Sequence, residues 1–235
     1  MRTSAGFLAL VAAALMPVPV AAAAAPRTAQ DWSRTVAATP SGAYRMGNPR
    51  AKVKLVEYVS LTCPHCRAFD QNAGDALIKK YVKTGKVSLE YRNFVRDAYD
   101  VSAALISRCN GATGFFRLTR ALLKDQPVWT ATAEAAPSEQ VEALQNLPPG
   151  KMFAESARIA GLQQWAAVHG VPAARANRCL ADEKAIERLM AMTAGAIKDH
   201  PGFPGTPSFL LNGTLLEDTS TWEELEPKLR AALGG

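Results

Sequence analysis

Residues 53–69 read VKLVEYVSLTCPHCRAF, and this stretch decides the fold class. The part before the serine is apolar and rich in β-branched residues, which favours a buried β-strand. Pro64 suits the first turn of a helix, and apolar residues at helical spacing continue to about Val82. We therefore predict a strand, a short loop and a helix, with Cys63 at the point where the helix begins.

Two cysteines stand at the start of that helix. Cys63 and Cys66 are separated by Pro64 and His65 and can close a small disulfide. Backbone N–H groups and the helix dipole favour a thiolate at Cys63, and the His65 imidazole can add to this effect. Cys66 lies one turn further in and should be shielded. Disulfide exchange requires an accessible thiol of low pKa with a second thiol beside it, so we take these residues as a candidate redox centre.

Other uses of two cysteines at this spacing fit the sequence less well. A structural zinc site needs four ligands, and no second Cys or His pair stands at usable spacing. A c-type haem site needs His directly after the second cysteine, where this chain has Arg67. An inert structural disulfide remains an alternative, as does a thiol site for copper. We predict no metal and no tightly bound organic cofactor.

The rest of the chain changes character twice. A second strand is expected at Val87, Leu89 and Tyr91, which would face one way. From residue 97 to residue 200 the pattern is helical, with breaks at Pro and Gly clusters. The helices expected there span 101–108, 115–123, 141–144, 152–168 and 173–197. Strand signals then return on both sides of Asn212-Gly213, a strong two-residue hairpin turn. Thr221 and Glu224 have the spacing of a capping box and should start a final helix. The predicted order is strand–helix–strand, an all-helical insert, and a hairpin followed by a helix.

The chain resembles the DsbA family of thioredoxin-fold thiol:disulfide oxidoreductases. The resemblance rests on Glu57-Tyr58-x-Ser60-x-x-Cys63-Pro64-His65-Cys66, on Gly205-Thr206-Pro207 before a late strand, and on Asn212-Gly213 after it. It implies an α/β thioredoxin fold with a large all-helical insertion domain. The expected parts are a signal peptide (1–24), a flexible leader (25–42), the first part of the thioredoxin domain (43–96), the helical insertion (97–200) and the second part (201–235).

The resemblance also implies roles for residues around the redox pair. Pro207 should follow a cis peptide bond, and Thr206 would then present backbone groups to an extended substrate beside Cys63 and Pro64. Glu57 would relay a proton for Cys66, as the acid at this position often does in the family. The lysine that often accompanies this acid has no counterpart on the second strand.

Cys109 and Cys179 both fall in the helical insert, 70 residues apart. In an exported protein the simplest interpretation is a structural disulfide between them, and some DsbA-like proteins have such a second bridge. Closing a loop of this length could stabilise the fold by about 4 kcal/mol in the chain-entropy model. Two buried free thiols are the alternative.

The first residues indicate export. A positive Arg2, an apolar run and several A-x-A sites have the order of a secretory signal, which places the protein in the periplasm.

The net charge of +6 is modest and the basic residues are scattered, so nucleic-acid binding is not expected. Hydrophobic content of 48% is enough for a real core.

The resemblance implies an oxidase that donates its Cys63–Cys66 disulfide to reduced, unfolded exported proteins. Reoxidation would come from a membrane quinone reductase of the DsbB kind, and we expect a monomer. The alternatives are a periplasmic disulfide reductase or isomerase and a thiol-based copper-binding chaperone. The reductase and isomerase relatives need an N-terminal dimerisation domain, for which the chain leaves too little room.

Overall fold

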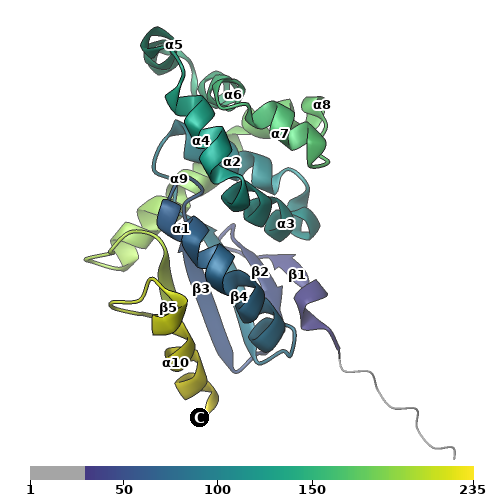
Figure 1. The fold of residues 1–235 in the computed structure, drawn as a ribbon, viewed down its shortest axis with the longest axis vertical. Helices are drawn as coiled ribbons and strands as arrows, with labels where there is room; N and C mark the ends of the chain where they lie inside the picture. The colour runs from purple at the N-terminus through teal and green to yellow at the C-terminus, as the bar shows by residue number, and fades with distance from the viewer. Residues whose placement is uncertain (1–29) are drawn as a thin grey trace, which may run out of the picture.

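The computed structural model describes residues 30–235. The expected signal peptide and the first residues of the expected leader lie outside this range. The described chain contains a six-stranded sheet with helices around it (Figure 1). The strands are β1 (Val36–Ala38), β2 (Tyr44–Gly47), β3 (Val53–Val59), β4 (Val87–Asn93), β5 (Ser208–Leu211) and β6 (Thr214–Leu215).

The sheet has the order β1-β2-β4-β3-β5-β6. Strand β3 is central and runs parallel to β4 on one side and antiparallel to β5 on the other. A strand from the C-terminal part of the chain therefore completes the sheet beside the strand that leads to Cys63. The α/β fold with an all-helical insertion, which the sequence predicts, is confirmed.

Alternation along β3 separates two apolar layers. Val53, Leu55 and Val59 face a large core that also contains the predicted inward residues of β4. Tyr58 faces a smaller cluster with Ala196 on the other side of the sheet. Because side chains alternate between the faces of a strand, Glu57 points into the larger core together with Val53 and Leu55.

The helix that follows β3 covers the larger core. It begins as α1 (Pro64–Phe69) and continues with helical backbone through two π-helical segments, η2 (Asp70–Gly74) and η3 (Leu77–Val82). Its buried residues include Phe69 and Leu77, which belong to the same core as α10 (Trp222–Leu233) near the C-terminus. The predicted helix to Val82 is therefore present, and in Figure 1 it crosses the sheet from the helical part downwards.

The helical insert lies between β4 and β5 in the chain and forms the upper part of Figure 1. It consists of α2 (Ala98–Arg108), α3 (Gly111–Lys124), α4 (Gln126–Glu134), α5 (Ser138–Ala143), η4 (Leu144–Asn146), α6 (Pro149–Ile159), α7 (Leu162–Val168), α8 (Ala173–Leu180) and α9 (Glu183–Asp199). Ala103, Leu105 and Leu118 are among its buried residues and belong to the same core as the sheet.

Three expectations from the sequence need correction. The leader is not unstructured from residue 30 onward, because η1 (Trp32–Arg34) precedes β1, and β1 pairs with β2 as an edge strand. The single helix expected over residues 152–168 is divided at Gly161, whose φ of +67° ends one helix and starts the next. The helix expected over 173–197 is divided where Asp182 caps α9.

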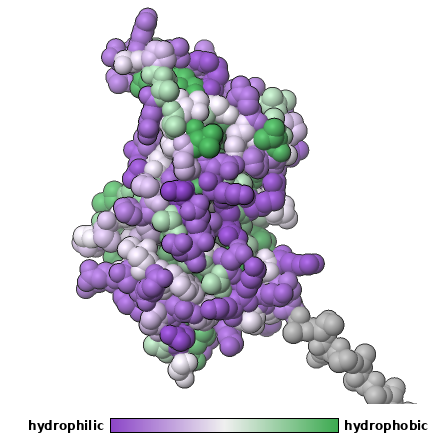
Figure 2. Space-filling view, viewed as in Figure 1, coloured by the Kyte–Doolittle hydropathy of each residue, from purple (hydrophilic) through white to green (hydrophobic). Residues whose placement is uncertain are grey.

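The surface in Figure 2 is polar over most of the visible face, with small and separate apolar patches on the helical part. No helix among residues 30–235 combines the length and the apolar character that crossing a membrane requires.

The hairpin around Asn212-Gly213 and the Thr221 capping box of α10 are both present as the sequence predicts.

Candidate redox site

Strand β3 and helix α1 place the two cysteines. The chain leaves β3 at Val59, and Cys63 is the N-terminal cap of α1, with Pro64 in the first turn. Both thiols are free in the structure, and Cys66 has no exposed surface. The sequence predicts an accessible Cys63, but this residue is only 3% exposed. The reason is a second loop, which packs against its sulfur.

That second loop carries Thr206 and Pro207, joined by a cis peptide bond. The loop ends where β5 begins, and β5 pairs with the last part of β3, so Ser208 lies beside Tyr58. This pairing brings the carbonyl oxygen of Thr206 to 3.1 Å from Cys63 Sγ. The buried hydroxyl of Thr206 makes no hydrogen bond of ordinary geometry within residues 30–235, but it lies close enough to Cys63 to help lower the pKa of that thiol.

The two thiols have opposite acidities. A hydrogen bond from the Cys66 side chain is the largest of the causes that lower the pKa of Cys63 to about 4. Burial acts against this effect, while the Thr206 side chain and the backbone N–H groups of Cys66 and His65 add to it. For Cys66, burial and the neighbouring Cys63 thiolate both raise the pKa well above its usual value. One sulfur is thus an anion at neutral pH and the other keeps its proton.

His65 and Pro64 are exposed beside the pair. The structure uses the backbone N–H of His65 to stabilise the thiolate. Its imidazole makes no hydrogen bond with any residue in 30–235, so the role expected for this ring is not visible in the geometry. Next to Pro64 a cleft of about 660 Å³ reaches α4 and α5, and Thr62 and Trp129 are among the residues that line it.

Glu57 lies on β3, six residues before Cys63, and is 1% exposed, as its place on a buried strand predicts. Tyr91, its neighbour on β4, hydrogen bonds to it. Oxygen Oε2 of Glu57 has no partner within the described chain. Burial is the main cause that raises the pKa of this carboxyl well above its usual value, and the Asp70 carboxylate adds to it. The charge of Glu57 in turn raises the pKa of Cys66, so the two groups are coupled.

Two side chains of the insert hold the loop before Cys63, and sequence reasoning did not find them. Asp100 on α2 accepts hydrogen bonds from Ser60 Oγ at 2.6 Å and from the backbone N–H of Leu61 at 2.8 Å. Gln126 Nε2, at the start of α4, donates to the carbonyl oxygens of Leu61 (2.7 Å) and Cys63 (3.0 Å). Both side chains are buried. A single polar residue inside a helix gives no signal of a partner far away in the chain.

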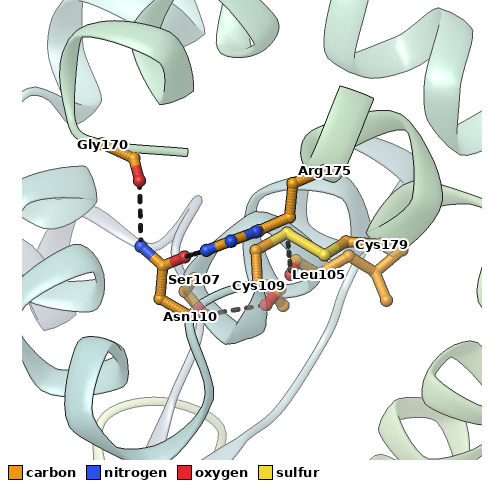
Figure 3. The surroundings of a disulfide bond; sticks show 8 residues. Leu105, Ser107, Cys109, Asn110, Gly170, Arg175 and Cys179 are labelled. Carbon is orange, nitrogen blue, oxygen red and sulfur yellow. Dashed lines mark hydrogen bonds between the residues drawn. A yellow bond between two sulfur atoms is a disulfide. The ribbon is translucent and has the colours of Figure 1, made fainter. Parts of the chain in front are cut away.

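Cys109 and Cys179 are joined by a disulfide that links the end of α2 to α8 (Figure 3). Beside it, Asn110 donates to the carbonyl oxygen of Gly170 and accepts from Arg175 at 2.8 Å. The bridge and these hydrogen bonds connect the α2–α3 turn with the α7–α8 segment. In residues 30–235 no three His, Cys, Asp or Glu side chains gather as a metal site would require.

The chain is similar in sequence and in structure to known proteins. The family model described as thioredoxin matches residues 39–230. A protein-disulfide isomerase from Novosphingobium aromaticivorans is 34% identical to this chain in sequence. Its crystal structure has a TM-score of 0.77 over 81% of this chain and 97% of that one. The structure of alpha-DsbA1 from Wolbachia pipientis, at 22% identity, has a TM-score of 0.66 over 83% of this chain and 92% of that one.

Curated relatives give a similar result. A Rickettsia typhi protein, whose name provisionally assigns it to the protein-disulfide oxidoreductases, is 31% identical over 74% of this chain and 56% of its own length. A relative from Rickettsia felis is 32% identical over 72% of this chain and 52% of its own length. The chain thus spans about half the length of the curated relatives it matches.

Proposed function

Because the chain belongs to the thioredoxin family and has the DsbA-type form of its fold, we propose that it is a protein-disulfide oxidoreductase that works as a dithiol oxidase. In this proposal the Cys63–Cys66 pair is oxidised and passes its disulfide to reduced proteins. The same residues supply the nucleophile, the resolving thiol and the substrate-binding loop.

The observation that carries the proposal is the difference in acidity between the two thiols. A pKa of about 4 makes Cys63 a good leaving group and stabilises the reduced form of the pair. A pair whose reduced form is stabilised gives up its disulfide readily, so it acts as an oxidant. Cys66, with its raised pKa, ends the reaction as a protonated thiol.

The reaction has two exchanges. A substrate thiolate attacks Cys63 Sγ, the bond to Cys66 Sγ breaks, and Cys66 leaves with the electron pair and takes up a proton. A second substrate thiolate then attacks the substrate sulfur of the mixed disulfide and expels the Cys63 thiolate. The substrate has lost two electrons and two protons in total, and the enzyme pair is reduced.

Glu57 supports the first exchange. Burial raises the pKa of its carboxyl and so favours the protonated form, and its charge raises the pKa of Cys66. We propose that it gives this proton to the departing Cys66 thiolate and accepts it back when the pair is reoxidised.

Thr206 and Pro207 form the substrate-binding part of the site in this proposal. Their loop contacts Cys63 Sγ and continues into β5. An extended peptide can pair with backbone groups there as an added strand, and Pro64, next to Cys63 in the sequence, is exposed. Because Cys63 is buried, a substrate must align along this loop before its sulfur can reach the site.

The N-terminal sequence supports the proposed place of work, and the resemblance to the DsbA family supports the proposed partners. We propose export to the periplasm after removal of residues 1–24, action on newly exported proteins as a monomer, and reoxidation by a membrane quinone reductase of the DsbB kind. The Cys109–Cys179 bridge in the structure is compatible with an oxidising compartment.

Isomerisation is the second candidate function. It is favoured by the name of the 34% identical structure, a protein-disulfide isomerase. An isomerase must act in its reduced form, attack wrong disulfides and release them again. The same low-pKa thiolate could do so, and the reduction potential of the pair separates the two functions.

The deciding experiment is equilibration of the Cys63–Cys66 pair with glutathione, followed by two assays on one preparation. One assay oxidises a reduced two-cysteine peptide, and the other reshuffles a scrambled protein. We expect a potential well above the roughly −270 mV of thioredoxin, and oxidation faster than reshuffling. Cys63→Ser should abolish both activities, whereas a Cys109→Ala/Cys179→Ala control should keep them. A potential near that of thioredoxin, or reshuffling without oxidation, would overturn the oxidase proposal.

A further inference from the structure

Four ionisable side chains from four elements meet under the active-site helix. They are Glu57 on β3, Asp70 on η2, Tyr91 on β4 and Arg120 on α3. The first three are nearly inaccessible, with 1%, 5% and 2% of their surface exposed. We call this set the Glu57 cluster. Buried charges are costly unless they are paired, so the arrangement of these groups calls for an explanation.

Tyr91 connects Glu57 to the helical insert. The two residues are neighbours in the parallel pairing of β3 and β4, and the Tyr91 hydroxyl hydrogen bonds to Glu57. The Tyr91 ring packs on Phe116 of α3, with ring centroids 5.1 Å apart. Arg120 follows Phe116 by one helical turn and therefore lies on the same face of α3.

Arg120 is held in place by two carboxylates. Its Nε lies 2.9 Å from Asp70 Oδ1 and its Nη2 lies 3.0 Å from Asp75 Oδ1. Gly74 leaves room for the first pair. A Cβ at this position would meet Asp70 Oδ1 at 2.8 Å and Arg120 Nη2 at 3.1 Å. The ion pair therefore depends on a glycine in the helix, as well as on a cation from a different part of the chain.

The charged and titratable groups that face Glu57 are Cys66, Asp70, Tyr91 and Arg120, whereas its neighbour on β5 is the apolar Phe209. Burial and the Asp70 carboxylate raise the pKa of Glu57. The Tyr91 hydrogen bond and the Arg120 guanidinium lower it. The effects of Asp70 and Arg120 thus have opposite signs, although the two residues form one ion pair.

We propose that Asp70, Tyr91 and Arg120 are positioning residues that set the protonation state of Glu57, so that the helical insert controls proton transfer at Cys66 through Arg120. The proposal rests on the redox function proposed above for Cys63 and Cys66. It places the cation that serves the buried acid on α3 of the insert, where no inspection of the neighbouring strand could find it.

The proton balance is simple. When a substrate thiolate breaks the Cys63–Cys66 bond, the electron pair goes to Cys66 Sγ and the proton of the Glu57 carboxyl follows it. Glu57 is left as a carboxylate while the pair is reduced. During reoxidation, when Cys63 is in a mixed disulfide with the DsbB-like partner, the Glu57 carboxylate takes the proton from the Cys66 thiol. The resulting thiolate attacks Cys63 Sγ and expels the thiolate of the partner, which carries away the two electrons.

The test is a titration of Glu57 in the reduced full-length protein. Glutamate labelled with ¹³C in the side-chain carboxyl is followed by NMR across pH, and Glu57→Gln assigns the resonance. We expect Asp70→Asn to lower the midpoint, and Arg120→Met and Tyr91→Phe to raise it, each by about one pH unit. Asp75→Asn is the matched control, because it removes the exposed partner of the same arginine and should leave the Glu57 midpoint in place.

Further variants separate this proposal from a structural role. Arg120→Lys should restore the midpoint of the wild-type protein. The Asp70→Asn/Arg120→Met double variant, which removes both members of the ion pair, should fall between the two single variants. The pH profile for release of glutathione from a mixed disulfide at Cys63 should move in the same directions. Midpoints that do not move, or that all move in one direction, would overturn the proposal. The Glu57 titration does not depend on the substrate, so it can fail or succeed independently of the oxidase assay.

Discussion

The carboxylate of Asp100 accepts a hydrogen bond of 2.8 Å from the backbone N–H of Leu61, two residues before Cys63. The same carboxylate accepts one from Ser60 Oγ, so a residue of the first insert helix fixes the loop that carries the redox pair. Burial is the largest cause that raises the pKa of Asp100, to about 7, against its usual value of 3.8. Hydrogen bonds to this carboxylate from Ser60, Leu61 and the backbone N–H of Arg96 only partly oppose this rise.

Asp100 should make the folding stability depend on pH. Because its pKa is higher in the folded than in the unfolded protein, its contribution is fully present below about pH 3.8 and is lost as the pH rises to about 7. From pH 5 to pH 8, urea unfolding should show the wild type losing roughly 3 kcal/mol relative to Asp100→Asn. Asp199→Asn, an exposed acid at the end of α9, is the control. A constant difference between wild type and Asp100→Asn would contradict the assignment.

The acidity of Cys63 should depend on its partner. Thiolate absorbance at 240 nm in the reduced protein should titrate with a midpoint near 4 and should be absent at pH 6 in Cys63→Ser. Cys66→Ala removes the hydrogen bond that lowers the pKa most, so the midpoint should rise. Cys66→Ser keeps a donor and should raise it less. Equal midpoints in the two Cys66 variants would show that this hydrogen bond is not the main cause.

Gly74→Ala should destabilise the protein by about 1–3 kcal/mol because the added Cβ would crowd the Asp70–Arg120 pair. Gly195→Ala is the matched control. Gly195 lies inside α9, and its added Cβ would meet nothing closer than 4.0 Å. Helix propensity then predicts a gain of about 0.5–1 kcal/mol. Both changes are measured by urea unfolding, and a gain at Gly74 would show that the ion pair does not need this space.

The Cys109–Cys179 bridge should stabilise the fold without taking part in exchange. It closes a loop over a sequence separation of 70 residues, so Cys109→Ala/Cys179→Ala should lower the free energy of unfolding by about 4 kcal/mol in the chain-entropy model. Peptide oxidation at a temperature where the variant is folded should match the wild-type rate. Loss of oxidation in a folded variant would mean that these sulfurs take part in the reaction.

The parts of the fold that were predictable have local causes. The tetrapeptide at Cys63, the Asn212-Gly213 turn and the Thr221 capping box each act within a few residues, and the structure contains the elements they predict. Strand β1 was not predictable in this way. Its Val36-Ala37-Ala38 sequence has little strand character, and it forms because β2 offers an edge to pair with.

The parts of the site that were missed depend on distant contacts. Arg120 is an ordinary basic residue on a helix until the fold places it against Asp70. Gln126 and Asp100 likewise have no local partner that would mark them. The burial of Cys63 depends on a loop far along the chain, which is why its sequence position suggested an accessible thiol.

The 143-residue separation between Cys63 and Thr206 has a consequence for the newly made protein. Ribosomal synthesis proceeds from the N-terminus, so the two thiols and their helix emerge while the segment that faces them is still untranslated. An incomplete chain holds reactive sulfur but lacks the surface that aligns a client. Selective disulfide exchange therefore cannot begin until translation has passed Thr206 and β5 has paired with β3.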